Sequence, residues 1–389
     1  MMKVAIVHYW LVAMRGGEKV LEALCRLFPQ AEIFTHVYNP DAISDQIKQH
    51  AIRTTFINKL PFAKQLYPKY LPLMPLALEQ LDLRGFDLVI SSESGPAKGV
   101  LTSATTRHIC YCHSPMRYLW DMYQDYLEEL SPISRVGMRL LAPRLRQWDA
   151  ISSMRVDHYV ANSQTIAARI GKHYRRKAEV IHPPVDVAAF RPQDGIFSRP
   201  EPDAPYLCLG QLVGYKRVDL AVKACTATNR RLVVVGEGPF RKELQASAGP
   251  TVQFVGWLNP DAVKKQIIGC RALLFPGEED FGIVPVETQA AGRPVIAYRK
   301  GGALETVKDG VTGLFFDEQT VPSLTDALDR FEQHEKDFDP QILNAHAQSF
   351  APEFFDTAFM DTVTKVMRQT DNTDKQLSAR NNLPPCGHF

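Results

Sequence analysis

Short apolar runs alternate with helical stretches along almost the whole chain, and this alternation restricts the fold more than any other feature of the sequence. Such an order is typical of parallel sheets whose strands are joined by crossover helices. The candidate strands include 3–8, 31–35, 86–91, 107–112, 157–161 and 178–182 in the first half, and 205–210, 231–236, 252–255, 272–275, 294–298 and 313–316 in the second. Each set is large enough for one doubly wound sheet, so the sequence predicts an α/β fold.

A proline-bearing segment separates the two sets of strands. Residues 181–186 contain two consecutive prolines, which interrupt both strand ladders and helices. A chain of 389 residues is long enough for two domains that each bury a core. We therefore predict an N-terminal domain over 1–184, a C-terminal domain over 185–352, a helix over 353–370 and a disordered polar tail over 371–389.

The composition is that of a soluble globular protein, with 45% hydrophobic and 23% charged residues. The net charge of +2 gives no reason to expect nucleic acid as a partner. No run of 18 apolar residues occurs and the chain enters a strand at Lys3, so we expect neither a membrane span nor a signal peptide. The seven cysteines are scattered, and Cys110 and Cys112 lie too close for an unstrained bridge, so we expect reduced thiols in a cytoplasmic protein.

Two glutamates, Glu279 and Glu287, lie eight positions apart between a predicted buried strand and a helix. Gly282 allows close approach of the backbone, and the N–H groups of Phe281, Gly282 and Ile283 point in one direction at the start of the helix. A helix N-terminus attracts phosphate, and carboxylates suit the hydroxyls of sugars. A nucleotide-activated sugar supplies both groups, so we expect it as the ligand.

The alternative, two glutamates on an ordinary surface helix, is disfavoured because Pro276-Gly277 and Phe281-Gly282 suit a plain helix poorly. With this E-x(7)-E element the chain resembles the retaining GT-B glycosyltransferases of family 4 over residues 3–368. The resemblance implies two Rossmann-like domains facing each other across a cleft, the first for the acceptor and the second for the nucleotide sugar. It also implies that the helix over 353–370 returns to the N-terminal domain.

Two features of the first domain lie at the carboxyl ends of predicted strands, where α/β proteins bind their ligands. Gly16-Gly17 lets backbone amides approach a ligand, and the resemblance places it against the donor phosphate and the acceptor. His113 is implied to lie beside the transferred sugar as a positioning group that need not be a base. A tight turn and a structural histidine are the alternatives.

The segment that follows His113 contains four candidates for contacts with the acceptor: Arg117, Tyr118, Trp120 and Asp121. For the two aromatic residues the alternative is packing in the core.

Lys216 and Arg217 follow the first strand of the second domain, where two cations can stabilise the leaving diphosphate. The family usually has Arg where Gln211 stands. Either Arg217 supplies the second positive charge, or Gln211 donates a hydrogen bond to a phosphate oxygen. An exposed basic turn is disfavoured, because cations at a helix N-terminus oppose the helix dipole.

Further glycine turns line the predicted donor side. Gly236 and Gly238 fit the nucleotide side of the family's cleft, although Gly-x-Gly alone is a weak signal. Trp257 either stacks on the base or packs against the protein. Gly301-Gly302 is expected to shape the wall of the donor pocket.

Two segments mix basic with apolar residues and suggest an anionic membrane surface, residues 58–78 and 134–148. The alternative for each is an amphipathic helix that packs its apolar side on the first sheet and leaves its basic side in solvent. A lipid-linked acceptor favours the membrane-surface interpretation and predicts a peripheral protein on the inner face of the cytoplasmic membrane.

The mechanism that we expect is transfer of a hexose with retention of the anomeric configuration. Glu279 would bind sugar hydroxyls, Glu287 the ribose, and Lys216 with Arg217 the leaving group. Neither a metal nor a cofactor is expected, since the sequence contains no metal-ligand cluster and no convincing Asp-x-Asp pair. The segments 112–121 and 214–219 look most like those of bacterial mannosyltransferases of O-antigen, lipopolysaccharide and exopolysaccharide synthesis.

That likeness implies GDP-mannose as the donor and a lipid-linked oligosaccharide as the acceptor. UDP-glucose and UDP-N-acetylglucosamine remain open as donors. A non-hydrolysing nucleotide-sugar epimerase of the same fold, and a binding subunit without activity, are the rival functions.

Overall fold

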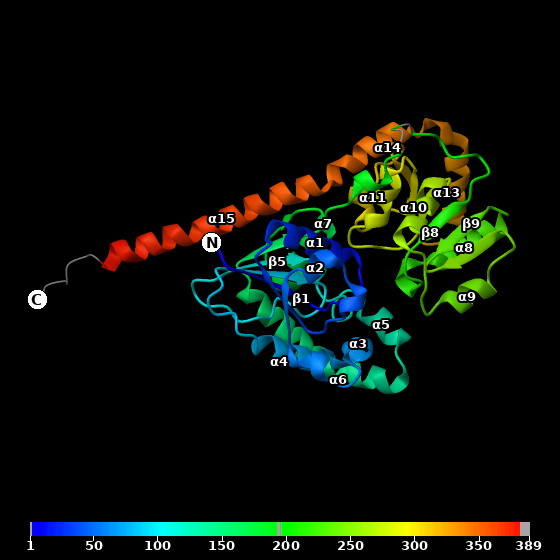
Figure 1. Cartoon of the computed structure of the whole chain (residues 1–389). Helices are drawn as coiled ribbons and strands as arrows, with labels where there is room; N and C mark the ends of the chain where they lie inside the picture. The colour runs from blue at the N-terminus through cyan, green and yellow to red at the C-terminus, as the bar shows by residue number, and fades with distance from the viewer. Residues whose placement is uncertain (1, 193–194, 196, 382–389) are drawn as a thin grey trace, which may run out of the picture. The chain divides into compact units, whose positions relative to one another are not determined.

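The computed structural model describes residues 2–192, 195 and 197–381, with side chains up to residue 368 (Figure 1). The chain forms two compact units. Unit 1 contains residues up to Asn162, Ile166–Ile181 and the residues from Phe355 on; unit 2 contains Ser163–Thr165 and His182–Phe354. The predicted boundary at 184/185 lies three residues after the start of the main part of unit 2.

Unit 1 is built on a seven-stranded parallel sheet with the order β3-β2-β1-β4-β5-β6-β7. Its strands are β1 (Val4–His8), β2 (Glu32–Thr35), β3 (Ala51–Thr54), β4 (Leu88–Glu93), β5 (Arg107–Cys112), β6 (His158–Ala161) and β7 (Ala178–Val180). All five side chains of β1 are buried, because both faces of a parallel sheet are covered by helices. In register, Ile6 of β1 lies between Ile33 of β2 and Ile90 of β4.

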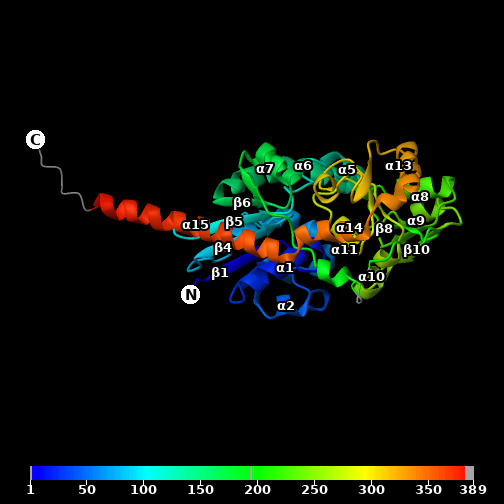
Figure 2. The ribbon, with the colours of Figure 1, turned by 90° about the horizontal axis from the view of Figure 1, so that it is seen from above.

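The helices of unit 1 cover both faces of this sheet (Figures 1 and 2). They are α1 (Gly16–Leu27), α2 (Asp45–Lys48), α3 (Ala63–Leu66), α4 (Met74–Glu79), α5 (Tyr123–Glu129), α6 (Pro132–Ser152), α7 (Gln164–Tyr174) and α15 (Pro352–Asn381). The segment 58–78 is broken into short helical pieces, because prolines at 61, 68, 72 and 75 interrupt it.

The edge strand β3 was absent from the predicted set. Its sequence Ala-Ile-Arg-Thr has no apolar run, and its side chains alternate between exposed and half-buried. An edge strand buries little surface, so it lacks the hydrophobic pattern by which the central strands are recognised.

Helix α15 begins at Pro352, and from Phe355 on its residues belong to unit 1. Phe355, Phe359 and Val363 pack in the same core cluster as Ile6 of β1. The helix continues to Asn381, beyond the predicted end at residue 370, and the added stretch contains neither glycine nor proline. The predicted disorder of the tail stays a prediction. The rest of the predicted tail, 382–389, lies outside the described residues.

Unit 2 is built on a six-stranded parallel sheet with the order β10-β9-β8-β11-β12-β13. Its strands are β8 (Tyr206–Leu209), β9 (Leu232–Val235), β10 (Val252–Gly256), β11 (Leu273–Phe275), β12 (Val295–Tyr298) and β13 (Gly313–Phe316). Its helices are α8 (Val218–Ala227), α9 (Arg241–Ala246), α10 (Pro260–Gly269), α11 (Ile283–Ala290), α12 (Ala303–Thr306), α13 (Val321–His334) and α14 (Pro340–Ala347). All six strands predicted for this half are present, and the α/β fold class is confirmed.

Each sheet has one position where the strand order reverses, and this position locates its candidate site. The reversal lies between β1 and β4 in unit 1, and between β8 and β11 in unit 2. Loops leaving neighbouring strands in opposite directions open a crevice at the carboxyl ends there, where α/β proteins bind ligands.

Within the described residues, no helix has both the length and the apolar character needed to cross a bilayer. Cys25, Cys110, Cys112, Cys208, Cys225 and Cys270 are free and buried, and Cys386 lies outside the described residues.

Candidate active site

In unit 2 a cation and a carboxylate meet at the point where the strand order reverses. Lys216 ends the short helix that follows β8, and Glu279 lies in the loop after β11. The Lys216 Nζ lies 2.9 Å from the Glu279 Oε1, and the two side chains are 22% and 16% exposed. The two motifs, predicted separately from the sequence, therefore form one charged and accessible pair.

Two glycines make room for Lys216. A Cβ atom on Gly210 would lie 2.7 Å from the Lys216 Nζ, and one on Gly277 would lie 2.7 Å from its Cα. The contact at Gly277 is with the backbone and leaves no room for a side chain, and Gly210 has a φ of 147°, which favours glycine. These glycines allow the loops after β8 and β11 to approach each other around the ammonium group.

Helix α11 begins directly beside this pair. Gly282 precedes its first residue with φ of 92°, a backbone conformation that favours glycine. The N–H groups of the first turn, Ile283 among them, have no partner within a helix, and they carry its positive end. Phe281 is buried and stacks on His182 with ring centroids 5.3 Å apart, which fixes the loop. Glu287 is half-buried on the same helix.

Gly301 and Gly302 support the loop that carries Glu279. A Cβ on Gly301 would lie 2.4 Å from the Glu279 backbone oxygen, and one on Gly302 would lie 2.2 Å from the Cα of Phe281. The Gly302 N–H donates to the Glu279 oxygen at 2.8 Å. These contacts agree with the expected role of this turn in shaping the pocket wall.

Gly236 and Gly238 have a structural reason to be glycines. A Cβ on Gly236 would lie 1.9 Å from the Gly210 oxygen, and one on Gly238 would lie 2.2 Å from the Leu212 oxygen. The loops after β8 and β9 thus pack backbone on backbone. Contact of these glycines with a donor stays a prediction. Trp257 is 74% exposed, so it does not pack in the core and is free to stack on a ligand.

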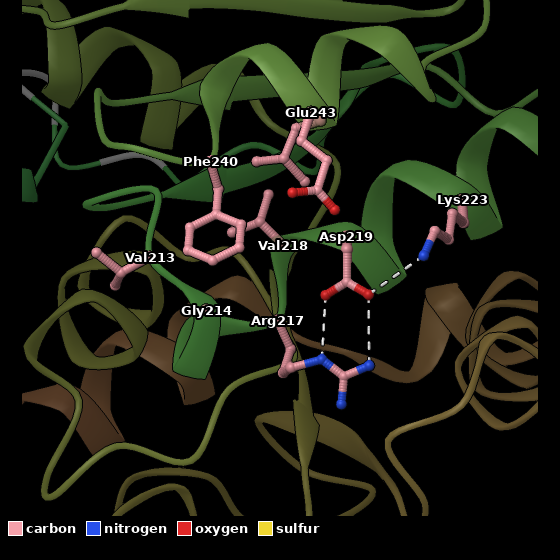
Figure 3. A pocket seen from close by; sticks show the side chains of 9 residues that line it. Val213, Gly214, Arg217, Val218, Asp219, Lys223, Phe240 and Glu243 are labelled. Carbon is pink, nitrogen blue, oxygen red and sulfur yellow. Dashed lines mark hydrogen bonds and ion pairs between the residues drawn. The ribbon is translucent and has the colours of Figure 1, made fainter. Parts of the chain in front are cut away.

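Arg217 points to a different partner from Lys216. Its Nε donates to the Asp219 Oδ1 at 3.0 Å, and Lys223 lies 3.5 Å from the same carboxylate (Figure 3). These side chains line a pocket of about 220 Å³ whose apolar wall includes Phe240. Asp219 already compensates the charge of Arg217. The predicted role of Arg217 toward a diphosphate therefore stays a prediction. Gln211, the residue that departs from the family pattern, is exposed.

In unit 1 the candidate site centres on His113, which follows β5. Its N–H donates to the Glu93 oxygen at 2.7 Å, and Asn162 donates to its carbonyl at 3.0 Å. The ring is partly exposed, and its Nε2 lies 2.9 Å from the Ser92 Oγ. Burial, together with the nearby His8, lowers the pKa of His113 to about 3, so its imidazole is neutral at pH 7.

Gly16 and Gly17 open helix α1 next to this histidine. A Cβ on Gly17 would lie 2.1 Å from the Tyr9 Oη and 3.6 Å from the His113 Nε2. Gly17 is therefore needed for the packing of Tyr9 beside His113, whereas Gly16 is exposed.

The four predicted acceptor residues lie in different environments. The Trp120 ring stacks on His173 with centroids 4.7 Å apart, and Asp121 lies 3.2 Å from the same histidine, whose hydrogen bond lowers the pKa of the carboxyl. Arg117 is half-buried. The Tyr118 hydroxyl is buried without a hydrogen-bond partner among the described residues, and burial raises its pKa. Trp120 and Asp121 thus make structural contacts, and their role toward an acceptor stays a prediction.

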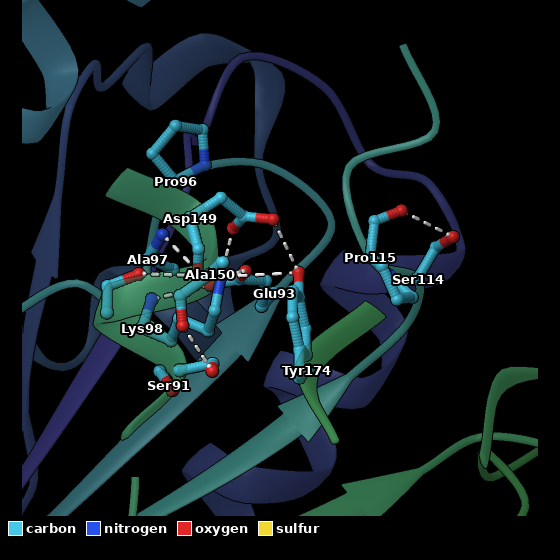
Figure 4. Close-up of polar contacts among 12 residues, drawn as sticks. Ser91, Glu93, Pro96, Ala97, Lys98, Ser114, Pro115, Asp149, Ala150 and Tyr174 are labelled. Carbon is cyan, nitrogen blue, oxygen red and sulfur yellow. Dashed lines mark hydrogen bonds and ion pairs between the residues drawn. The ribbon is translucent and has the colours of Figure 1, made fainter. Parts of the chain in front are cut away.

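A buried ionic network that no sequence motif indicates lies beneath the loops of unit 1 (Figure 4). The Lys98 Nζ donates to Glu93 at 2.7 Å, to Asp149, and to the Tyr174 hydroxyl at 3.3 Å, and none of the three charged groups is exposed. Asp149 also accepts from Trp120 at 2.7 Å and Tyr174 at 2.9 Å.

Every donor of the Lys98 ammonium is used in this network. Burial alone lowers the pKa of Lys98, but Asp149 and Glu93 together raise it above its ordinary value. Asp149 lies 51 positions from Lys98, and no local pattern indicates such a pairing.

Comparisons with known proteins agree with this geometry. Residues 14–189 match the family model for Glycosyltransferase Family 4, and residues 191–347 match that for Glycosyl transferases group 1. A D-inositol 3-phosphate glycosyltransferase of Nocardioides sp. is 28% identical over 213 residues, 46% of this chain and 46% of the relative. A GDP-mannose-dependent alpha-(1-6)-phosphatidylinositol monomannoside mannosyltransferase of Mycobacterium tuberculosis is 33% identical over 176 residues, 39% of this chain and 45% of the relative. The matched segments span less than half of the length of these curated relatives.

Among solved structures, Anabaena Alr3699/HepE in complex with UDP and glucose has a TM-score of 0.68 at 16% identity, over 94% of this chain and 100% of that chain. At this identity the likeness concerns the fold. The two family models together cover most of the chain, both units are Rossmann-like, and the chain therefore belongs to the GT-B glycosyltransferases of family 4.

Proposed function

We propose that this chain transfers a hexose from a nucleoside diphosphate sugar to an acceptor hydroxyl. The observation that carries this proposal is the accessible pair of Lys216 and Glu279 beside the N-terminus of α11, at the reversal point of the unit 2 sheet. An ammonium group and a helix N-terminus suit the two phosphates, and a carboxylate suits the hydroxyls of the sugar.

In the proposed reaction the bond between the anomeric carbon and the phosphate oxygen breaks, and the acceptor oxygen bonds to the same face of that carbon. The proton of the acceptor hydroxyl moves to the departing phosphate oxygen. Lys216 and the first-turn amides of α11 stabilise the charge that develops on the diphosphate, and Glu279 orients the sugar. This course retains the anomeric configuration and uses no group beyond the chain and its substrates.

His113 suits the role of a hydrogen-bonding partner of the sugar better than that of a base. A histidine with a pKa of about 3 holds a proton too weakly to accept one from a hydroxyl in a productive step at pH 7. A neutral imidazole still offers one donor and one acceptor for orienting a hydroxyl.

For the donor we propose GDP-mannose. The mycobacterial relative is described as GDP-mannose-dependent, and the family resemblance of the segments around His113 and Lys216 favours the same sugar. A UDP-sugar is the second candidate, since the Anabaena structure of this fold contains UDP and glucose.

For the acceptor we propose a lipid-linked oligosaccharide of cell-surface polysaccharide synthesis, reached from an anionic membrane surface. Helix α6 carries Ile133, Val136 and Leu140 at spacings of three and four, 88%, 57% and 73% exposed. Arg139 and Arg144 are exposed on the same helix. An exposed apolar stripe flanked by cations suits anionic headgroups.

The segment 58–78 extends this apolar and basic surface. Phe62 and Leu76 are 73% and 53% exposed. Leu71 packs against the buried cluster that contains Ala142 and Leu145 of α6, so the two segments are neighbours within unit 1.

The test is a panel of radiolabelled GDP- and UDP-sugars, each with and without bacterial membrane lipid extract. We expect label to enter the lipid fraction from GDP-mannose only, with the same yield in EDTA as in manganese. Epimerised donor without lipid would identify an epimerase, and incorporation from a UDP-sugar would replace the proposed donor. Binding without turnover of any donor would contradict the proposed activity.

A further inference from the structure

A chain of polar side chains connects His113 to the buried interior of unit 1. The His113 Nε2 lies 2.9 Å from the Ser92 Oγ, and that oxygen lies 3.0 Å from the His8 Nδ1. The His8 Nε2 makes no hydrogen bond within the described residues, and the Glu18 Oε1 lies 3.5 Å from it, at ion-pair distance. His8 and Ser92 are fully buried and Glu18 is 1% exposed, so water does not compete for these contacts.

The carboxylate end of this chain is held at the start of α1. The Glu18 Oε2 accepts from the Arg15 N–H at 2.9 Å, and Glu18 lies in the first turn of the helix. The helix dipole favours a negative charge at this position. Glu18 is therefore suited to act as a fixed acceptor facing the His8 ring.

The Glu18 carboxylate determines where each hydrogen atom lies along this chain of side chains. A carboxylate has no proton to donate, so the His8 Nε2 carries the proton and the His8 Nδ1 is an acceptor. The single Ser92 hydroxyl proton then points to His8, and the Ser92 oxygen accepts from the His113 Nε2–H. The remaining ring nitrogen of His113, Nδ1, is left with a lone pair.

The packing around His113 keeps the ring in this orientation. Tyr111 and Tyr9 contact it edge-on, with centroids 5.2 and 6.4 Å away. The absence of a side chain on Gly17 allows the Tyr9 ring to lie there.

We infer that Glu18, His8 and Ser92 are positioning residues that fix His113 in its Nε2–H tautomer, so that its Nδ1 accepts a hydrogen bond from a hydroxyl of the ligand. A lone pair at this point selects a hydroxyl donor and disfavours a phosphate oxygen, which can only accept. The identity of the ligand as a hexose rests on the proposed function; the tautomer does not.

The test reads the tautomer directly, from the ring nitrogen shifts and two-bond couplings in NMR spectra of the full chain labelled with ¹⁵N-histidine. The His113 signals are assigned as those missing in His113→Asn. We expect the Nε2–H tautomer in the wild type. Glu18→Gln keeps the bond to the Arg15 N–H, because glutamine also serves in a capping box, but its amide can turn a donor toward His8. The chain of hydrogen bonds then reverses and the Nδ1–H population of His113 rises several-fold.

Glu22→Gln, one turn further along α1, is the matched control and leaves the tautomer unchanged. Ser92→Ala interrupts the chain without adding bulk and is expected to give a mixture of tautomers. An Nδ1–H tautomer in the wild type, or a His113 tautomer that neither Glu18→Gln nor Ser92→Ala alters, overturns the inference.

Turnover supplies a second readout. In the presence of a working donor, Glu18→Gln and Ser92→Ala should lower kcat/KM about tenfold, while Glu22→Gln remains near the wild type. If the tautomer shifts as expected but no donor of the panel is turned over by the wild type, the positioning chain stands and the proposed function fails. If the wild type turns over a donor but the tautomer does not shift in the variants, the proposed function stands and the positioning chain fails.

Discussion

The two units build their candidate sites in contrasting ways. In unit 2 the candidate side chains, Lys216 and Glu279, are charged, partly exposed and in direct contact. In unit 1 the candidate side chain, His113, is neutral, and buried hydrogen bonds through Ser92 to His8 lie behind it. Beneath that site a second set of charges, centred on Lys98, is wholly buried.

The difference follows from what each unit is proposed to contact. A site for a diphosphate needs a cation that a ligand can reach from solvent. The Lys216 ammonium must replace its contact with Glu279 by a contact with a phosphate oxygen. A neutral hydroxyl needs a group with a defined donor and acceptor, which requires fixed geometry rather than charge. Changes in unit 1 should therefore affect stability and orientation, and changes in unit 2 should affect chemistry.

Lys98→Met is the sharpest test of the stability half of this comparison. It leaves Glu93 and Asp149 buried without a cation, so we expect unfolding free energy to fall by about 3 to 5 kcal/mol. Urea unfolding followed by tryptophan fluorescence measures this, because Trp10, Trp120 and Trp148 all lie in unit 1. Lys265→Met, on exposed α10 surface, is the control. A loss below about 1 kcal/mol would mean that the network is worth no more than a surface ion pair.

Lys216→Ala tests the chemical half. Losing a preorganised cation at the developing charge should lower kcat by about 10²- to 10³-fold, with little change in the urea midpoint. Steady-state transfer assays with the working donor measure the effect. Lys265→Ala removes an exposed lysine of the same unit and should retain full activity. Turnover of Lys216→Ala within a few-fold of the wild type rules out the charge-neutralising role.

The pH dependence of stability gives an intermediate effect in unit 1. Burial lowers the pKa values of His36 and His108 to about 4, so the unfolded chain binds more protons than the native one between pH 6.5 and pH 4. Stability contributed by these neutral rings is thus present above pH 6.5 and is lost as the pH falls. We expect a loss of about 1 to 2 kcal/mol for the pair between pH 7 and pH 6.

Urea midpoints of Trp257→Phe, in which the remaining tryptophans report on unit 1, measure this loss. The raised pKa of Glu93 acts in the opposite direction, so the histidine contribution is isolated with His36→Gln. This change should reduce the histidine contribution by about a third, because the lowered pKa of His113 adds to those of His36 and His108. A midpoint that rises on acidification would reverse the assigned sign.

Sequence reasoning located the central strands and the charged loops because both have local signals. The strand Val4–His8 is a continuous apolar run, and the motif around Glu279 combines glycine, carboxylate and helix start within a few residues. The edge strand Ala51–Thr54 was missed, since a polar edge strand buries too little surface to leave a hydrophobic pattern.

The buried contacts that support the candidate site of unit 1 could not be predicted from the sequence, for a different reason. Lys98 meets Asp149 across 51 positions and His8 meets Ser92 across 84, and a single sequence carries no information on which distant residues share a site. Gly236 and Gly238, by contrast, stand out in a local sequence pattern. The structure adds that their closest neighbours are backbone atoms of the adjacent loop, and their contact with a donor stays a prediction.

Removing single positive charges from the surface of α6 should have the smallest effect. These substitutions test whether unit 1 also carries the proposed membrane contact. Arg139→Gln and Arg144→Gln should each lower partitioning onto vesicles with anionic headgroups by about fivefold, since one cation near such a surface contributes about 1 kcal/mol. The loss should vanish in high salt or on neutral vesicles, because screening removes the attraction.

Lys265→Gln removes one exposed charge from unit 2 and should leave partitioning unchanged. Leu140→Asp, in the centre of the exposed stripe, separates apolar insertion from attraction, since its loss should persist on neutral vesicles. Equal losses from the unit 1 and unit 2 substitutions would show that net charge, rather than this helix, draws the chain to the surface.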